Sequence, residues 1–266
     1  MTKVVDDDRQ QYAEKIKTYQ EVIESIVHWE QEFLNTIQAE PADATLKRLN
    51  LVEQMLNLTS YYLIINEVSY SMLQFANKNA LEDGRKSLSK GITYLQDMVT
   101  NYVDQPFSEY EDKVAPLEPV NPAERYRLIR KMGLTIQLLE NAYGDNTKWK
   151  WFFVDLEGRF SAVTKNIFDM KNMIVNMDPR SPYYEPAVYH MRLIKKLLQK
   201  SADRFREKYE LATKARQDFQ MGINFLNALR RIHILLGDSY EAEQLKKKVD
   251  VWSAKMETDI KNRTEA

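Results

Sequence analysis

The chain has 266 residues, of which 44% are hydrophobic and 29% are charged, and its formal net charge is −1. It contains no cysteine, which excludes disulfides, thiol catalysis and cysteine-ligated metals. Only 7 glycines and 8 prolines occur, too few turn residues for an all-β or α/β protein of this length, and alternating runs typical of strands are absent. Composition therefore predicts an all-α protein built from a few long amphipathic helices.

Residues 1–103 are predicted to form an N-terminal region of long helices. The first helix covers residues 8–38 and is stopped by Pro41. Its inner residues recur at alternating spacings of four and three, which is a heptad stripe with Glu30 as its one polar member. Two further helices are expected over residues 45–78 and 81–102. The apolar stripe of the second helix is wide, which predicts packing against more than one neighbour.

Residues 104–122 are predicted to be a proline-rich linker. Four prolines fall in this acidic stretch, and proline at that density favours a semi-rigid, extended spacer over a helix. The charge changes sign nearby: residues 1–120 hold 11 basic and 20 acidic residues (net −9), and residues 121–266 hold 27 and 19 (net +8). We expect a domain boundary here. The charge asymmetry suits head-to-tail or antiparallel association, unless it only reflects solvated helix faces of different sign.

Residues 123–266 are predicted to form a C-terminal helical region. Its first helix begins with Asn121 at the cap, Pro122 at the first position and Glu124 at the third, and it ends at Gly144. Another helix is expected over residues 145–177.

The longest predicted helix covers residues 186–236. Its apolar and small residues recur at spacings of three and four throughout, and Gly222 is its only weak point. At about 1.5 Å per residue it would be a rod of roughly 75 Å, so we expect an elongated molecule with coiled-coil-like packing. Gly237 ends the rod. Asp238 and Glu241 then form a capping box for a last helix that folds back as a hairpin.

No pattern of catalytic, cofactor-binding or metal-ligating residues is found. Nucleotide-binding glycine clusters are absent, and none of His28, His190 and His233 has the glutamate three positions earlier that a helical di-iron site requires. No run of 18 apolar residues predicts a membrane span, and the acidic N-terminus lacks the apolar segment of a signal peptide. We therefore expect no enzymatic activity, cofactor, metal, small-molecule substrate, nucleic acid or integral membrane association.

Two groups of residues are candidates for a protein interface. Four aromatic residues within five positions cover all sides of a helix, so some should meet a partner, although a junction inside the domain explains them equally well. The rod also carries a basic strip. Nucleic-acid or anionic-membrane binding is conceivable there, but interleaved acidic residues favour a solvated flank. The candidate interface residues are Trp149, Trp151, Phe152, Phe153, Tyr183, Tyr184, Lys195, Lys196 and Arg204.

Three stretches of this cysteine-free chain carry a family resemblance: residues 148–153, residues 178–184 and the rod through Leu236-Gly237-Asp238. In these stretches, and in its overall plan of long helices split by a proline linker, the chain resembles the flagellar coiling proteins of spirochaetes. The resemblance covers most of the chain and rests on no diagnostic motif. It implies a V-shaped, all-helical periplasmic protein that lies on the flagellar filament as a sheath, binds core flagellins and a sister sheath protein, and imposes curvature for motility.

The expected function is therefore that of a structural component of a filament assembly, with flagellar filament proteins or its own kind as partners. Members of the resembling family have a secretion signal, so the periplasmic flagellum is the expected location if that signal has been removed, and the cytoplasm otherwise. The alternative is a cytosolic coiled-coil adaptor or membrane-curving helical dimer formed through residues 188–236. A third reading, an enzyme on a helical scaffold, would require a pocket with shifted titratable groups.

Overall fold

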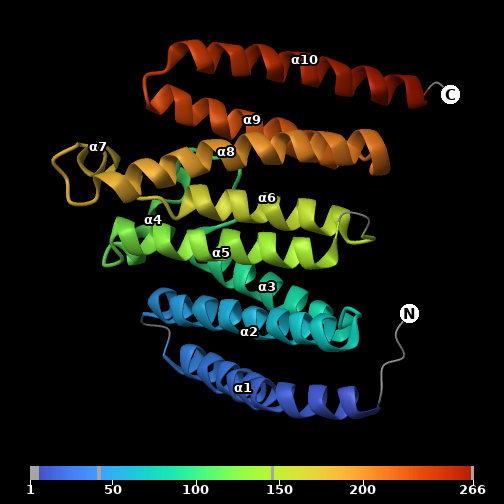
Figure 1. Cartoon of the computed structure of the whole chain (residues 1–266). Helices are drawn as coiled ribbons and strands as arrows, with labels where there is room; N and C mark the ends of the chain where they lie inside the picture. The colour runs from blue at the N-terminus through green and yellow to red at the C-terminus, as the bar shows by residue number, and fades with distance from the viewer. Residues whose placement is uncertain (1–5, 41–42, 145–146, 265–266) are drawn as a thin grey trace. The chain divides into compact units, whose positions relative to one another are not determined.

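In the computed structural model, which describes residues 6–40, 43–144 and 147–264, every regular element is helical (Figure 1). The all-α prediction is therefore confirmed. The helix stop at Pro41 and the helix start at Asp145 lie outside the described residues. None of the described helices is both long and apolar enough to cross a membrane. The chain forms two compact units: unit 1 comprises residues 1–98 and 127–147, and unit 2 comprises residues 99–126 and 148–266.

Unit 1 is built around α2, which is buried on several sides. Ile16 and Ile23 of α1 pack against it at their predicted heptad positions. On another side, the backbone of α3 comes so close that a Cβ on Gly91 would lie 3.2 Å from Met55 Cβ. This confirms that the second helix has more than one neighbour. The helices of unit 1 are α1 (Asp6–Ala39), α2 (Ala44–Leu73), nearly all of α3 (Lys78–Val99) and most of α5 (Pro122–Tyr143).

Glu30, the polar member of the α1 stripe, is only 2% exposed and is fully paired by α3. Its carboxylate accepts a hydrogen bond of 2.8 Å from Lys90 Nζ and one of 2.5 Å from the Tyr94 hydroxyl. A buried carboxylate without such partners would be costly. Glu30, which interrupts the heptad pattern, therefore determines how α1 packs against α3.

Unit 2 contains four long helices that lie side by side in chain order, α6, α8, α9 and α10 (Figure 1). Their core includes Leu198, Phe219, Leu226 and Trp252. The helix predicted over residues 145–177 ends earlier than expected, and a separate short helix follows it. The elements of unit 2 are α4 (Glu111–Val114), α6 (Lys150–Asn166), α7 (Met173–Asn176), α8 (Tyr184–Lys208), α9 (Arg216–Leu235) and α10 (Ser239–Thr264).

The prediction of one continuous rod is wrong. Residues 186–236 form α8 and α9, which turn back on each other after a π-helical turn at Tyr209–Thr213. The turn contains neither glycine nor proline, so the sequence pattern gave no sign of a helix break there. Folding back is favoured because it buries the apolar face of α9 against α8; for example, Phe219 stacks on Tyr209 with ring centroids 4.6 Å apart. The inference of an elongated molecule rested on this rod and is therefore no longer supported.

Residues 104–122 are also not an extended spacer. They form short helical turns, including Phe107–Glu109 and Ala115–Leu117, and Tyr110, Val114 and Leu117 are buried in unit 2. Proline is compatible with the first positions of such turns, because its fixed φ suits a helix start. The segment packs against the rest of unit 2 because the apolar residues between its prolines are buried there. The division at residues 98 and 126 differs from the predicted boundaries at 103 and 122, and residues 127–147, expected in the C-terminal region, belong to unit 1.

Both predicted helix caps are confirmed. The backbone N–H of Glu124 donates to Asn121 Oδ1 at 3.0 Å at the start of α5. The backbone N–H of Glu241 donates to Asp238 Oδ1 at 3.3 Å at the start of α10. These caps satisfy helix donors that have no partner within the helix.

Candidate functional site

The aromatic cluster at the start of α6 belongs largely to the interior of unit 2. Phe153 is fully buried, and Trp151 packs against the core with Lys150 Nζ 4.7 Å from its ring centroid. Trp149 and Phe152 are half-buried and meet edge to face at 6.0 Å. Phe153 is therefore an interior residue of unit 2, Trp151 is partly buried against the core, and Trp149 and Phe152 are partly exposed.

Tyr183 and Tyr184 lie half-buried at the start of α8. Figure 1 shows α6 and α8 running antiparallel, so the start of α8 and the start of α6 are at opposite ends of unit 2. The structure thus does not bring the two predicted aromatic groups together into one surface.

Most of the basic strip is engaged in ion pairs within unit 2. Lys200 and Arg204 both bind the carboxylate of Glu157 on α6, which is 7% exposed. Lys208 is buried and bridges Asp155 of α6 and Asp218 of α9, at 2.6 and 3.0 Å. These cations tie α8 to its neighbours.

Lys195 and Lys196 are the two predicted interface cations that remain at the surface, half-buried and exposed respectively. Arg204, by contrast, is a structural residue whose side chain is only 17% exposed.

Several exposed apolar side chains, absent from the sequence-based candidates, belong to elements at the end of unit 2 where α8 begins. α7 precedes α8 at this end, and the turn from α9 to α10 lies there too (Figure 1). Ile174 is 83% exposed and Val175 67%, and the other members are more than half exposed. We call this group of side chains the apolar end; its residues are Ile174, Val175, Ile234, Leu235 and Tyr240.

The short helix α7, which carries Ile174 and Val175, is held by hydrogen bonds and by packing. Asp169 accepts hydrogen bonds from the backbone and side-chain amides of Asn172 and from Asn176 Nδ2. Met173 packs back against the core of unit 2. Ile174 therefore lies exposed on a supported helical turn. Sequence analysis placed it inside one helix running to residue 177.

Buried polar groups gather at the C-terminal end of α6 and hold residues 99–126 in place. Asn166 is fully buried and donates to the carbonyls of Thr100 and Tyr102, which supports Thr100 at a left-handed φ of 95°. Lys165 Nζ donates to the Tyr110 hydroxyl at 3.3 Å, and burial lowers the pKa of Lys165 to about 8. Burial also lowers the pKa of His190 to about 4; its Nε2 lies 2.9 Å from the Thr164 carbonyl oxygen.

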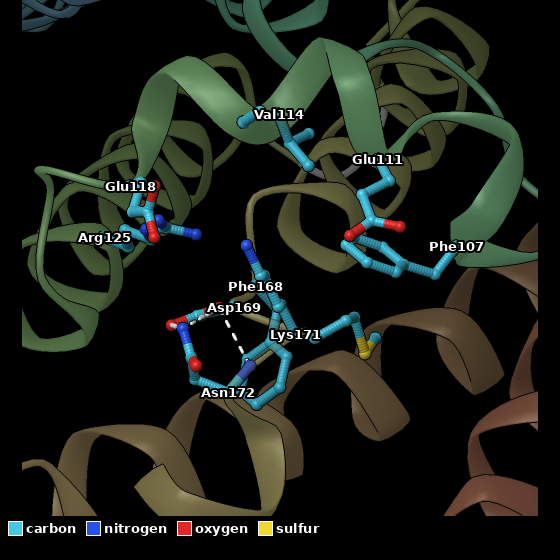
Figure 2. Close-up of a pocket in the computed structure, with 11 residues that line it drawn as sticks. Phe107, Glu111, Val114, Glu118, Arg125, Phe168, Asp169, Lys171 and Asn172 are labelled. Carbon is cyan, nitrogen blue, oxygen red and sulfur yellow. Dashed lines mark hydrogen bonds between the residues drawn. The ribbon is translucent and has the colours of Figure 1, made fainter.

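A pocket lies beside this cluster, between residues 107–125 and the segment after α6 (Figure 2). Arg125 lines it, and its guanidinium donates to the carbonyls of Leu117, Val120 and Ile167, while burial lowers its pKa. Carboxylates outnumber cations around it, and no hydroxyl, thiol or imidazole is among the described residues that line it. This lining does not single out a reaction. The residues are Phe107, Glu111, Val114, Ala115, Glu118, Arg125, Phe168, Asp169, Met170, Lys171 and Asn172.

Across residues 6–40, 43–144 and 147–264, no group of three or more histidine, aspartate or glutamate side chains is arranged to hold a metal ion. The exposed side chains of the apolar end are the candidate site of unit 2.

Comparison with known proteins identifies one family. Residues 8–260 match the TP0443 family, and the chain therefore belongs to it. No curated protein and no solved structure matches the chain.

Proposed function

We propose that this member of the TP0443 family is a non-enzymatic structural component of a filament assembly, and that it docks on its partner through the apolar end of unit 2. The assembly we propose is a flagellar sheath, in which the protein binds the filament core and imposes curvature for motility. Its partners are then flagellar filament proteins or further copies of the chain.

The observation that carries the docking proposal is the exposure of Ile174 and Val175. These two aliphatic side chains of α7 are more than half exposed. Each therefore forgoes most of the free energy of burial, which is about 1.5–3 kcal/mol for a fully buried side chain of this kind. Isolated exposed apolar residues are common, but several gathered at one end of a unit are typical of an interaction surface. Tyr240, an aromatic residue at 71% exposure, adds the kind of side chain that interfaces favour.

The flagellar part of the proposal rests on the resemblance to spirochaete flagellar coiling proteins. That resemblance was carried by residues 148–153, residues 178–184 and the segment through Gly237. The last two of these segments flank the apolar end, since residues 178–184 join α7 to α8 and Gly237 lies between α9 and α10. The same part of the chain thus supports both halves of the proposal.

The alternative of a coiled-coil adaptor or membrane-curving dimer depended on a continuous helix over residues 188–236. In the folded chain the apolar stripe of that segment is buried between α8 and α9. While the α8–α9 hairpin is closed the stripe is not exposed to another chain, and we favour the filament component.

Fractionation of the source cells tests the proposal. Purified flagellar filaments, periplasm, cytosol and membranes are probed for the chain by quantitative immunoblotting. We expect the chain to be enriched on filaments and to be released by the conditions that strip sheath proteins. Recovery in the cytosol with none on filaments would contradict the sheath assignment.

A further inference from the structure

The turn between α8 and α9 has an unusual sequence for a helix reversal. Residues 209–215 contain neither glycine nor proline and consist mainly of good helix formers. Lys214 nevertheless adopts a left-handed conformation, with φ at 52°, a position that usually requires glycine or asparagine. The turn also includes a π-helical segment, Tyr209–Thr213, closed by a bond from the Lys214 N–H to the Tyr209 carbonyl. Such π-helical segments occur frequently at functional sites.

The helical pattern continues through the turn without a break. Apolar and small residues keep the alternating spacing of three and four from α8 into α9, so a straight helix would present them as one stripe. The local sequence is therefore compatible with both a hairpin and a continuous helix. The members of this stripe are Leu198, Ser201, Phe205, Ala212, Ala215, Phe219, Gly222 and Leu226, with Lys208 as the one charged member.

The contacts between α8 and α9 do not depend on the turn itself. A Cβ on Gly222 would lie 3.1 Å from the Ala202 carbonyl oxygen, so the two helices touch backbone to backbone. Phe205 and Phe225 lie with ring centroids 5.6 Å apart. α10 adheres to α9, where Trp252 packs 5.8 Å from Phe219. The pair α9–α10 could therefore occupy the same place on α8 of another molecule.

We propose that two copies of this chain exchange residues 216–264 to form a dimer. In this dimer the turn straightens, α8 and α9 join as one helix over residues 184–235, and α9–α10 of each copy packs on α8 of the other. Each contact between α8 and α9 is kept across the two chains, while the left-handed strain at Lys214 is relieved. Exchange of identical elements is a low-cost route to dimers for this reason. The inference rests on unit 2 alone and is independent of the proposed function.

Arg216→Pro is designed to permit the hairpin and forbid the continuous helix. Arg216 is the exposed first residue of α9, the position where proline is favoured, and Ala215 before it is extended, at φ −78° and ψ 128°. Inside a continuous helix the same proline would remove a hydrogen bond and clash. Lys214→Gly relieves the strain of the hairpin and should also disfavour exchange.

Thr213→Ala is the matched variant of opposite effect. Thr213 Oγ1 accepts the Ala215 N–H at 3.2 Å and donates to Asp218 Oδ2, so its loss weakens the turn. Alanine also raises the helix propensity of the segment. This variant should form more dimer than the parent chain.

The test measures dimer content and the intrachain distance together. The full chain is concentrated, warmed to just below its melting temperature and cooled, and its mass is followed by size exclusion with light scattering. Because the chain has no cysteine, spin labels can be placed on Lys196→Cys and Ile234→Cys. One continuous helix would separate these positions by about 57 Å, whereas the hairpin brings them close. Doubly labelled chains are diluted with unlabelled chains so that only intrachain distances are read.

We expect a dimer with the long distance, at least tenfold less dimer for Arg216→Pro, and more for Thr213→Ala. The melting temperature of monomeric Arg216→Pro should equal or exceed that of the parent, which shows that the hairpin accepts the proline. A parent chain that stays monomeric, a dimer that retains the short intrachain distance, or a dimer unaffected by Arg216→Pro would overturn the inference.

Discussion

At the scale of single residues, Lys165 carries an ammonium group into the centre of unit 2. It is 3% exposed, and burial lowers its pKa to about 8 from the ordinary 10.5. Between those two values the unfolded chain binds a proton that the folded chain does not bind. The free energy of unfolding therefore rises with pH through this window. Below pH 8 the folded chain bears the full cost of the buried charge.

Lys165→Met tests this cost. Between pH 7 and pH 10 the stability of the parent chain should increase by about 2 kcal/mol relative to the variant, which lacks the titrating group. Urea unfolding of both proteins at the two pH values gives the difference. Parallel pH profiles for the two proteins would show that the lysine is not desolvated. Burial raises the pKa of Tyr110, which lowers stability above its usual pKa, so the comparison is read below pH 10 because Tyr110 contacts Lys165 directly.

Arg204 is a structural cation of α8, whereas Lys196 is a surface cation of the same helix. Arg204→Ala removes one of two partners of the buried Glu157 carboxylate and should lower the free energy of unfolding by about 2 kcal/mol. Lys196→Ala, on the exposed side of the same helix, should change it by less than about 0.5 kcal/mol. Equal effects in thermal or urea unfolding would refute this assignment of the basic strip.

At the scale of elements, α6 and α8 touch at Gly158. A Cβ there would lie 2.5 Å from Cε2 of Phe205, a buried ring with little room to move. Glycine to alanine in an open helix normally stabilises by roughly 0.5–1 kcal/mol. Gly158→Ala should instead destabilise by about 1–3 kcal/mol because it overpacks the contact. A rise in melting temperature would show that α6 and α8 are farther apart than described here.

The helices that sequence analysis predicted well are those with local signals. Asn121 and Asp238 mark helix starts by their own side chains, and the heptad stripe of α1 is visible in the spacing of its apolar residues. The predictions of a rod over residues 186–236 and of a spacer over residues 104–122 were wrong, because tertiary packing determines the structure of both segments. The α8–α9 reversal occurs at Lys214, where no breaker residue stands. The proline-rich segment folds because Tyr110 and Leu117 can be buried on α6.

At the scale of the whole molecule, the two units are less oppositely charged than the two halves of the sequence. Unit 1 contains 13 basic and 17 acidic residues (net −4), and unit 2 contains 25 and 22 (net +3). The difference arises because the acidic residues 99–126 fold into the basic unit, where Asp104 pairs with Arg231 at 2.6 Å. Much of the charge that suggested head-to-tail association is thus neutralised within unit 2.

The candidate site was the least predictable feature. Nothing in the composition of residues 173–176 distinguishes a short exposed helix from the end of a long buried one, because Ile174 and Val175 suit either. The longer helix ends at Asn166, whose side chain bonds Thr100 and Tyr102 from a distant part of the chain. A local pattern does not contain such a contact.

The central claim is that the chain assembles through the apolar end of unit 2, and its most direct test is binding to purified filaments. We would measure co-sedimentation of the Ile174→Asp, Val175→Asp double variant with filaments stripped of the chain. The matched control is Val251→Asp on α10, since Val251 is 67% exposed like Val175 but lies outside the apolar end. All three proteins should melt at similar temperatures, because the changed residues are exposed.

The account predicts that the double variant binds filaments about tenfold or more weakly than the parent, while Val251→Asp binds normally. Binding of the double variant at the parent level would contradict docking through this surface.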